Sequence, residues 1–212
     1  MYIPAHFRES RPEVLQALIR RHPLATLIAM TSDGLTANHI PMLLEMKDGA
    51  AWLRGHIARG NSLWREVPAG AQVLAIFTGA DHYISPTWYP SKREHGKAVP
   101  TWNYSAVHIK GAIRFIEDTA WLRAFVESLT DIHEGDRPDR WHVSDAPADY
   151  LESMLRAIVG FEIQVSAIDG KVKGSQNRSV ADRLGAAQVL HAAGVGPLDL
   201  AEIVRIVPDP GS

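Results

Sequence analysis

The spacing of the apolar runs in the first hundred residues constrains the fold more than any other feature. Each run is long enough for one strand, and turn residues such as Thr31-Ser32-Asp33-Gly34 and Lys47-Asp48-Gly49 separate the runs. Such spacing is typical of antiparallel strands joined by hairpins. A doubly wound parallel sheet would instead need strand and helix to alternate. The order of the runs therefore favours an antiparallel sheet.

We expect about six strands from the apolar and alternating runs. They are Leu24 to Met30, a second strand through Leu43 and Leu44, Ala51 to His56, Gln72 to Phe77, Trp102 to Ile116, and Phe161 to Val165, the last ending in an Asp169-Gly170 turn. The charged segment Ser91 to Lys97 is expected to be a loop, because it contains glycine and no apolar stripe.

Helical spacing of apolar residues, with start and stop signals, predicts helices at about residues 11–21, 59–66, 118–132, 147–157 and 180–193. Successive hairpins with helices at the start, middle and end favour a closed antiparallel β-barrel with peripheral helices on its outside, an α+β class. We expect one domain over residues 1–212.

Composition excludes several classes of function. The chain has 212 residues, a formal net charge of −2 and no cysteine. Disulfides, iron–sulfur clusters, thiolate zinc sites and a cysteinyl nucleophile are therefore excluded. The charge argues against a large, uniformly basic nucleic-acid surface. The start lacks a signal-peptide pattern and no apolar run approaches the ~20 residues that span a bilayer, so we expect a cytoplasmic protein with no membrane partner.

Two segments mix flat aromatic rings with hydroxyl and amide groups: Tyr83 to Tyr89 and Val99 to Tyr104. Aromatic rings bury large flat areas, and an amide between them, here Asn103, can orient one polar edge of a ligand. The mixture is typical of a pocket for a flat molecule. The alternative for the first segment is an edge strand that leads into a proline turn, with Trp88 and Tyr89 capping the core.

Two further segments carry cations at positions that suit an anion. Lys171 to Arg178 holds three cations around Ser175-Gln176-Asn177 and abuts a helix start at Ser179, where free backbone amides favour negative charge. Gly55 to Asn61 leaves a strand and enters a helix, where the Arg59 guanidinium can hold a phosphate. The alternatives are a solvated turn for the first and a surface cation for Arg59.

Other kinds of site find little support. No two of the ten histidines have the spacing of a zinc site, so we predict no metal. His39, His56 and His108 lie on expected strands, where a hydrogen-bonded core histidine is the commoner role. No serine sits in a nucleophile-elbow sequence, and no segment shows a dependable DNA-reading pattern, so we predict no catalytic triad and no direct DNA readout.

Taken together, the motifs resemble those of the PaiB-type, FMN-binding negative transcriptional regulators, from Met1 to about the last helix. The matching motifs are Met1 to Phe7, Gly55 to Arg59, Tyr83 to Pro86 with Trp88-Tyr89, Val99 to Tyr104, Val159 to Glu162, and Ser175 to Asn177. Position 174 is Gly where that family commonly has leucine, which predicts a looser loop before Ser-Gln-Asn.

The resemblance implies an antiparallel FMN-binding split barrel related to the pyridoxamine phosphate oxidase class, working as a homodimer with flavin at the subunit boundary. It also implies roles for residues: Arg59 as the first phosphate cation, Lys173 or Arg178 as a second, and aromatic walls and amides around the ring. The expected FMN-binding residues are Asn38, His39, Gly55, His56, Ile57, Ala58, Arg59, Asn61, Ser85, Trp88, Trp102, Asn103, Tyr104, Lys173, Ser175, Gln176, Asn177 and Arg178.

Three functions stay open at this point. The first is a regulator in which flavin, or its redox state, biases a dimer that controls transcription directly or through a partner. The second is an FMN-dependent oxidoreductase acting on a small flat substrate, with His39, His56 or His108 assisting. The third is a dimeric protein that binds neither flavin nor DNA. No residue pattern reads a base edge, so the sequence does not identify a DNA or regulatory partner.

Overall fold

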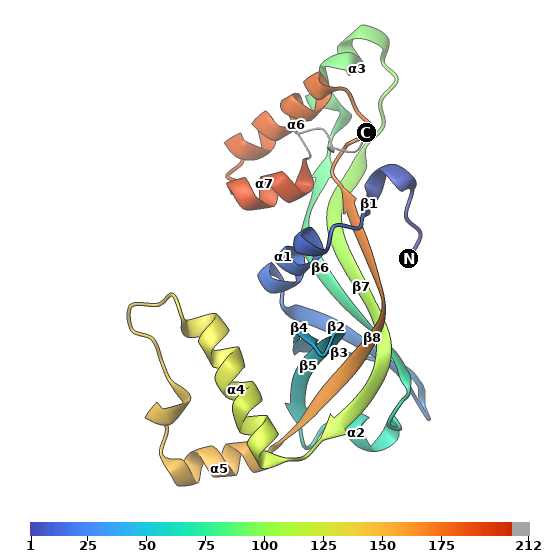
Figure 1. The fold of residues 1–212 in the computed structure, drawn as a ribbon. Coiled ribbons are helices and arrows are strands. Elements are labelled where there is room, and N and C mark those ends of the chain that lie inside the picture. The colour runs from blue at the N-terminus through green and yellow to red at the C-terminus, as the bar shows by residue number, and fades with distance from the viewer. Residues whose placement is uncertain (205–212) are drawn as a thin grey trace. The chain divides into compact units, whose positions relative to one another are not determined.

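The computed structural model describes residues 1–204, which form one hydrogen-bonded sheet of eight strands with helices (Figure 1). The hydrogen-bonding order is β3-β2-β6-β7-β8-β5-β4, and β1 pairs with β8. The strands are β1 (Arg8–Glu9), β2 (Leu24–Thr31), β3 (Gly34–Pro41), β4 (Leu43–Lys47), β5 (Ala50–Ala58), β6 (Gln72–Ile84), β7 (Thr101–Ile116) and β8 (Ile158–Lys173).

Seven α-helices lie within residues 1–204: α1 (Pro12–Arg21), α2 (Leu63–Glu66), α3 (Pro90–His95), α4 (Thr119–Glu134), α5 (Ala148–Arg156), α6 (Val180–Ala192) and α7 (Pro197–Ile203). The sequence predicted all of them except α3 and α7. The expected loop Ser91 to Lys97 was wrong, because Pro90 starts a helix and Gly96, with φ of +68°, ends it in the left-handed conformation.

Two of the strand predictions also need correction. The expected second strand is two strands, β3 and β4, separated at Met42, whose N–H donates to the Pro23 carbonyl at 2.9 Å. The expected Asp169-Gly170 turn is absent, because β8 continues to Lys173 and Gly170 pairs with Glu9 of β1. A side chain at Gly170 would come within 2.6 Å of the Glu9 carbonyl, so glycine here allows close strand pairing.

The sheet is not a closed ring of paired strands within residues 1–204, since β3 and β4 stand at the two ends of the hydrogen-bonding path. The expectation of a closed barrel is therefore corrected. All five strand pairs whose residue partners are known within residues 1–204 are antiparallel, including β2 with β3 and β5 with β8. The fold is an antiparallel split barrel with peripheral helices, of the α+β class.

The described chain divides into two compact units. Unit 1 comprises residues 1–22, 77–108 and those from 169 onward, and unit 2 comprises residues 23–76 and 109–168. Strands β6, β7 and β8 contribute residues to both units. The single domain over residues 1–212 stays a prediction, and its last part, residues 205–212, lies outside the described residues.

Each unit has its own apolar cluster. In unit 1, α6 and α7 lie side by side (Figure 1) and pack with β6 through Ile84, Tyr89, Ala186, Ala187, Leu190, Ile203 and Val204. In unit 2, α4 and α5 pack through Leu122, Val143, Leu151 and Leu155. Burial of these side chains, at ~25 cal/mol per Å² of apolar surface, holds the helices in place.

Candidate functional site

The expected FMN-binding residues fall into two groups, one in each unit, and each group is described by itself. Unit 2 contains Asn38, His39, Gly55, His56, Ile57, Ala58, Arg59 and Asn61. Unit 1 contains Ser85, Trp88, Trp102, Asn103, Tyr104, Lys173, Ser175, Gln176, Asn177 and Arg178.

In unit 2, the Arg59 guanidinium is held by protein acceptors. Its Nε donates to the Arg156 carbonyl at 2.7 Å, its Nη2 donates to the Ile158 carbonyl at 3.2 Å, and its Nη1 donates to the Glu117 carboxylate. The Arg59 backbone N–H also donates to the Ala157 carbonyl at 2.7 Å. Arg59 thus holds the chain where α5 leads into β8, and three of its five side-chain N–H groups already donate to protein acceptors.

The β5 residues around His56 point to alternating faces, as side chains of a strand must. The His56 ring contacts the Phe125 ring edge-on at 5.8 Å, while Gly55 and Ile57 are buried on the other face. Burial lowers the pKa of His56, which favours the neutral imidazole. Its Nδ1 is buried and has no hydrogen-bond partner within residues 1–204.

Asn38 and Asn61 come together, because the Asn61 amide donates to the Asn38 Oδ1 at 2.7 Å. Both line a hollow of about 300 Å³ with hydroxyl and carboxylate side chains, including Asp33 and Glu66. Two carboxylates disfavour a phosphate there. His39 is exposed on β3, the strand that carries Asn38, and its Nδ1 lies 3.1 Å from the Thr26 hydroxyl oxygen. Ala58 is exposed at the end of β5.

In unit 1, β7 presents Trp102 and Asn103 to opposite faces. Trp102 is exposed, whereas Asn103 is only 1% exposed. The Asn103 amide nitrogen donates to the Ser175 hydroxyl and to the Ile203 carbonyl, both at 2.8 Å. Asn103 therefore joins the Ser-Gln-Asn loop to the end of α7 through its amide nitrogen, while its buried Oδ1 has no hydrogen-bond partner within residues 1–204.

Side chains brace the Ser-Gln-Asn loop from within. Gln176 folds back so that its Oε1 accepts from the Gly174 N–H at 2.7 Å and its Nε2 donates to the Val172 carbonyl at 2.6 Å. Ser175, not Gly174, adopts the left-handed conformation, with φ of +61°, and Asn103 stabilises it. The expected loosening at Gly174 is therefore offset by the Gln176 bonds.

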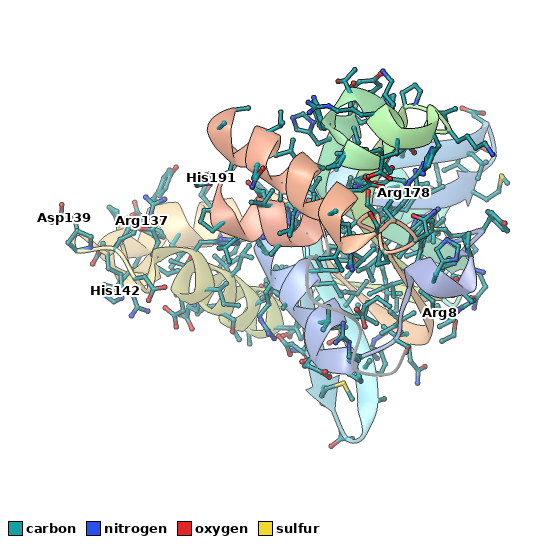
Figure 2. All side chains as sticks on the ribbon, turned by 90° about the horizontal axis from the view of Figure 1, so that it is seen from above. Arg8, Arg137, Asp139, His142, Arg178 and His191 are labelled. Atoms are coloured by element: carbon teal, nitrogen blue, oxygen red, sulfur yellow. The ribbon has the colours of Figure 1, made fainter. Side chains whose placement is uncertain are left out.

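The remaining residues of the loop and the turn differ in their surroundings. Asn177 is exposed, and the Arg178 guanidinium lies 5.2 Å from the centre of the Tyr89 ring. Figure 2 labels Arg178. Ser85 caps a short 3₁₀ helix, Pro86–Trp88, by accepting from the Thr87 N–H. Trp88 packs against the apolar cluster of unit 1, which supports the core-capping alternative for this segment.

One face of unit 1 combines aromatic rings with ammonium groups, and we term it the aromatic–lysine face: Tyr83, Trp102, Tyr104, Lys171 and Lys173. The Tyr83 and Trp102 rings meet edge-on at 6.0 Å, and both are exposed. The Lys171 Nζ donates to the Tyr104 hydroxyl at 2.6 Å, and the Lys173 Nζ donates to the Thr101 hydroxyl and the Trp102 carbonyl. Flat apolar area beside positive charge fits a flat, anionic ligand.

Glu202, on α7, was not among the expected site residues, and Lys171 was expected only as one of the three cations in the segment from Lys171 to Arg178. Glu202 accepts from the Ala80 N–H, the Ser105 hydroxyl, Arg21 and His22. Burial favours a raised pKa for Glu202, but the hydrogen bonds from Ala80, Ser105 and His22 hold the pKa below its usual range. From the sequence, Glu202 is only a charged residue near the C-terminus. Its partners Arg21, His22, Ala80 and Ser105 lie far from it along the chain, so local patterns do not indicate its role.

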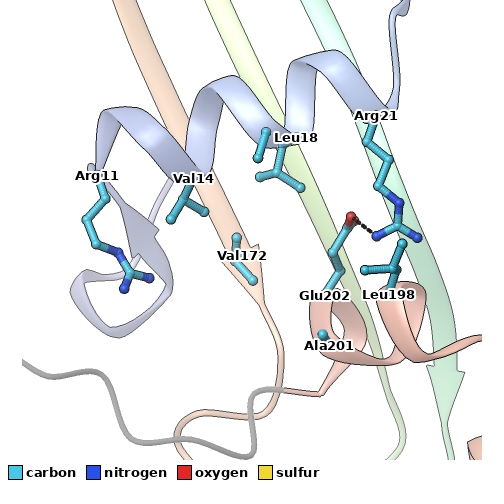
Figure 3. A pocket seen from close by; sticks show the side chains of 9 residues that line it. Arg11, Val14, Leu18, Arg21, Val172, Leu198, Ala201 and Glu202 are labelled. Carbon is cyan, nitrogen blue, oxygen red and sulfur yellow. Dashed lines mark hydrogen bonds and ion pairs between the residues drawn. The ribbon is translucent and has the colours of Figure 1, made fainter. Parts of the chain in front are cut away.

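Glu202 also lines a hollow between α1, β8 and α7, which Figure 3 shows with the bond from Arg21 to Glu202. The hollow has a volume of about 390 Å³, and its walls are mostly apolar side chains such as Val14, Leu18 and Leu198. Arg21 is neutralised by its acidic partners on α7, Asp199 and Glu202. The hollow therefore offers little charge to an anionic group.

The comparisons with known proteins agree with the flat-ligand interpretation. A family described as "Putative FMN-binding domain" matches residues 1–167. The chain belongs to this family. FMN is the cofactor of the domain, and the residues of the aromatic–lysine face suit its flat ring and its anionic phosphate.

Relatives of the family match along most of their length. "Protease synthase and sporulation protein PAI 2" of Bacillus subtilis is 34% identical over 192 residues, covering 90% of this chain and 89% of the relative. An uncharacterized protein of Aspergillus fumigatus is 34% identical over 233 residues, covering 87% of this chain and 88% of the relative. The first relative confirms the PaiB-type resemblance.

Solved structures share the fold at low identity. The flavocytochrome Anf3 from Azotobacter vinelandii aligns with a TM-score of 0.58 and 13% identity, over 80% of this chain and 72% of that one. The FAD and heme binding protein from Mycobacterium smegmatis aligns with a TM-score of 0.57 and 18% identity, over 77% and 72%. Within residues 1–204, no helix combines the length and apolar content needed to cross a membrane.

Proposed function

We propose that this chain is an FMN-binding regulator that acts as a homodimer and holds the flavin ring on the aromatic–lysine face. The observation that carries the proposal is the exposure of that face: Trp102 is 55% exposed and Tyr83 is 42% exposed, beside two ammonium groups. Large aromatic rings left in water beside cations are typical of a ligand surface.

The proposed dimer would cover the second face of the flat ligand. A ring that stacks on one exposed sheet face has its other face in water, and a second copy of the chain can cover it. The exposed Val99 side chain, which precedes β7, extends the apolar surface that a second copy would bury.

The regulatory role draws on the relatives. The Bacillus subtilis relative bears a name that refers to sporulation and to a protease synthase. In the proposed mechanism, binding of FMN, or a change in its redox state, shifts the dimer toward one arrangement, and that arrangement affects transcription directly or through a partner.

The alternative is an FMN-dependent oxidoreductase acting on a small flat substrate. The Tyr104 hydroxyl favours it, because a lysine ammonium can only donate, so the Tyr104 oxygen accepts from Lys171 and its own proton is left for a ligand. A phenol beside an ammonium is a suitable proton donor.

Four measurements test the proposal. Titration of the purified protein with FMN should quench flavin fluorescence, and sedimentation equilibrium should show a dimer. Binding to promoter DNA with little NAD(P)H-driven turnover supports the regulator, and steady turnover without DNA binding supports the oxidoreductase. No change in flavin fluorescence at any protein concentration would overturn both.

A further inference from the structure

Lys171 is a buried ammonium group that bonds to neutral oxygens in the part of the chain that the structure describes. Its residue is 8% exposed, and its Nζ donates to two neutral oxygens, the Tyr104 hydroxyl at 2.6 Å and the Tyr2 carbonyl at 3.3 Å. Within residues 1–204, no carboxylate forms an ion pair with it. Asp169, two residues earlier on β8, is paired with the terminal amine of Met1 at 3.9 Å.

Lys173 repeats the arrangement on the same face of β8. Its Nζ donates to the Thr101 hydroxyl and the Trp102 carbonyl, again neutral oxygens. Burial lowers the pKa of Lys173 and the neighbouring charge of Lys171 lowers it further, while Tyr104 acts in the opposite direction. Two like charges thus share one small region, with Arg8 directly across from Lys171 on β1.

Such an arrangement is costly unless a negative group completes it. A buried charge ordinarily has an opposite charge and enough hydrogen bonds to offset its desolvation. Arg11, a partly exposed cation of the same unit, has such a partner, because it forms two side-chain bonds to the Glu9 carboxylate. The uncompensated pair therefore indicates a missing anion.

We propose that Lys171, Lys173 and Tyr104 form an anion-binding site that receives a negatively charged oxygen of the flat ligand on the aromatic–lysine face. The ammonium groups supply the charge, and the Tyr104 hydroxyl donates its free proton to the same oxygen. The inference rests on the proposed flavin site and adds the group that anchors it. Either the phosphate or the polar edge of the ring offers such an oxygen.

Paired titrations with FMN and with riboflavin, which lacks the phosphate, test the site. The proteins are the wild type, Lys171→Met, Lys173→Met and the control Lys92→Met, which removes an exposed lysine on α3 of the same unit. Lys171→Met and Lys173→Met should weaken FMN binding tenfold or more, and Lys92→Met should not change it.

Riboflavin distinguishes the two sources of the oxygen. If the lysines hold the phosphate, the wild type prefers FMN to riboflavin and the two variants lose that preference. If they hold the edge of the ring, both ligands weaken alike. Variants that bind both ligands as tightly as Lys92→Met does would overturn the proposal.

A second measurement tests the anion site without flavin. If the wild type binds no flavin, the proposed function is wrong, but the anion site can still be tested. Inorganic phosphate should raise the melting temperature of the wild type above that in sodium chloride of equal ionic strength. Lys173→Met, at the more accessible lysine, should lose this gain, and Lys171→Arg, which keeps the charge, should retain it. An equal gain in all proteins would overturn the site.

Discussion

Both units place cations against aromatic rings, but Arg54 and Arg114 of unit 2 share a carboxylate, whereas Lys171 of unit 1 has none within residues 1–204. In unit 2, Arg54 lies over the Trp121 ring, Arg114 lies over the Trp52 ring, and both guanidinium groups bond to Glu162. In unit 1, Lys171 lies over the Tyr104 ring and meets neutral oxygens only. The same residue types thus form a completed network in one unit and an incomplete one in the other.

The difference separates a structural network from a binding surface. Glu162 is buried, and burial favours a raised pKa, but the bond and charge of Arg114, with Arg54 and Trp121, hold the pKa of Glu162 below its usual range. A carboxylate that stays ionised satisfies both arginines without a ligand. Among the described residues, Lys171 and Lys173 bond to neutral oxygens and to no such carboxylate, so an anionic ligand would stabilise them.

The largest effect is expected from a substitution that removes the carboxylate shared by Arg54 and Arg114. Glu162→Gln keeps the size of the side chain but removes the charge that offsets Arg54, so we expect the free energy of unfolding to fall by about 3 kcal/mol. Urea denaturation measures it. Glu152→Gln, which breaks an exposed pair with Arg156, is the control and should change little. Equal small losses would mean that the network adds nothing.

Arg59→Ala tests whether the clamp of unit 2 is structural. Removing its bonds to the Arg156 and Ile158 carbonyls should lower the unfolding free energy by about 2 kcal/mol, with FMN affinity nearly unchanged. Arg65→Ala, at an exposed arginine over the same Trp64 ring, is the matched control. A tenfold loss of FMN affinity at unchanged stability would instead make Arg59 a phosphate ligand.

Trp102→Ala tests whether the aromatic–lysine face of unit 1 is a binding surface rather than a structural network. Because the ring is exposed, stability should change little, while loss of stacking should weaken FMN binding by about 1 kcal/mol, roughly fivefold. Fluorescence titration measures the affinity. Trp141→Ala removes another exposed tryptophan, on the loop that carries Arg137, Asp139 and His142 in Figure 2, and should leave binding intact.

The smallest effect concerns pH. Because burial lowers the pKa of His56 from its usual 6.5, the unfolded chain binds its proton first as pH falls. The stability that the neutral ring contributes is thus present above that value and is lost as pH falls through the lower pKa of the folded state. His56→Phe should flatten the decline of unfolding free energy between about pH 7 and pH 5. Identical slopes would contradict the assignment.

Much of the fold could be predicted because the apolar period is a local signal. The strand Leu24 to Thr31 and the helices α4 and α5 follow from spacing alone. The Asp169-Gly170 turn was wrong because Asp-Gly commonly ends strands, while here Gly170 meets β1, which lies far away in the sequence. Such long-range pairing leaves no local trace.

The site was less predictable for a similar reason. The family motifs include Trp102 and Tyr104, which lie on the aromatic–lysine face, yet Asn103 points to the opposite face, as strand alternation already indicated. The bonds that Asn103 donates to Ile203, and that Ala80 and Ser105 donate to Glu202, depend on α7, whose position no motif encodes. The neutral surroundings of Lys171 are likewise visible only in three dimensions.

Strand β8 continues past residue 167, where the match to the family ends. A recombinant fragment stopped at that boundary would cut the strand in its middle and remove Lys171, the partner strand of β1 and both C-terminal helices. It would also leave Ala80 and Ser105 without their carboxylate acceptor. Expression designs and fusions for this family should therefore retain the chain through α7.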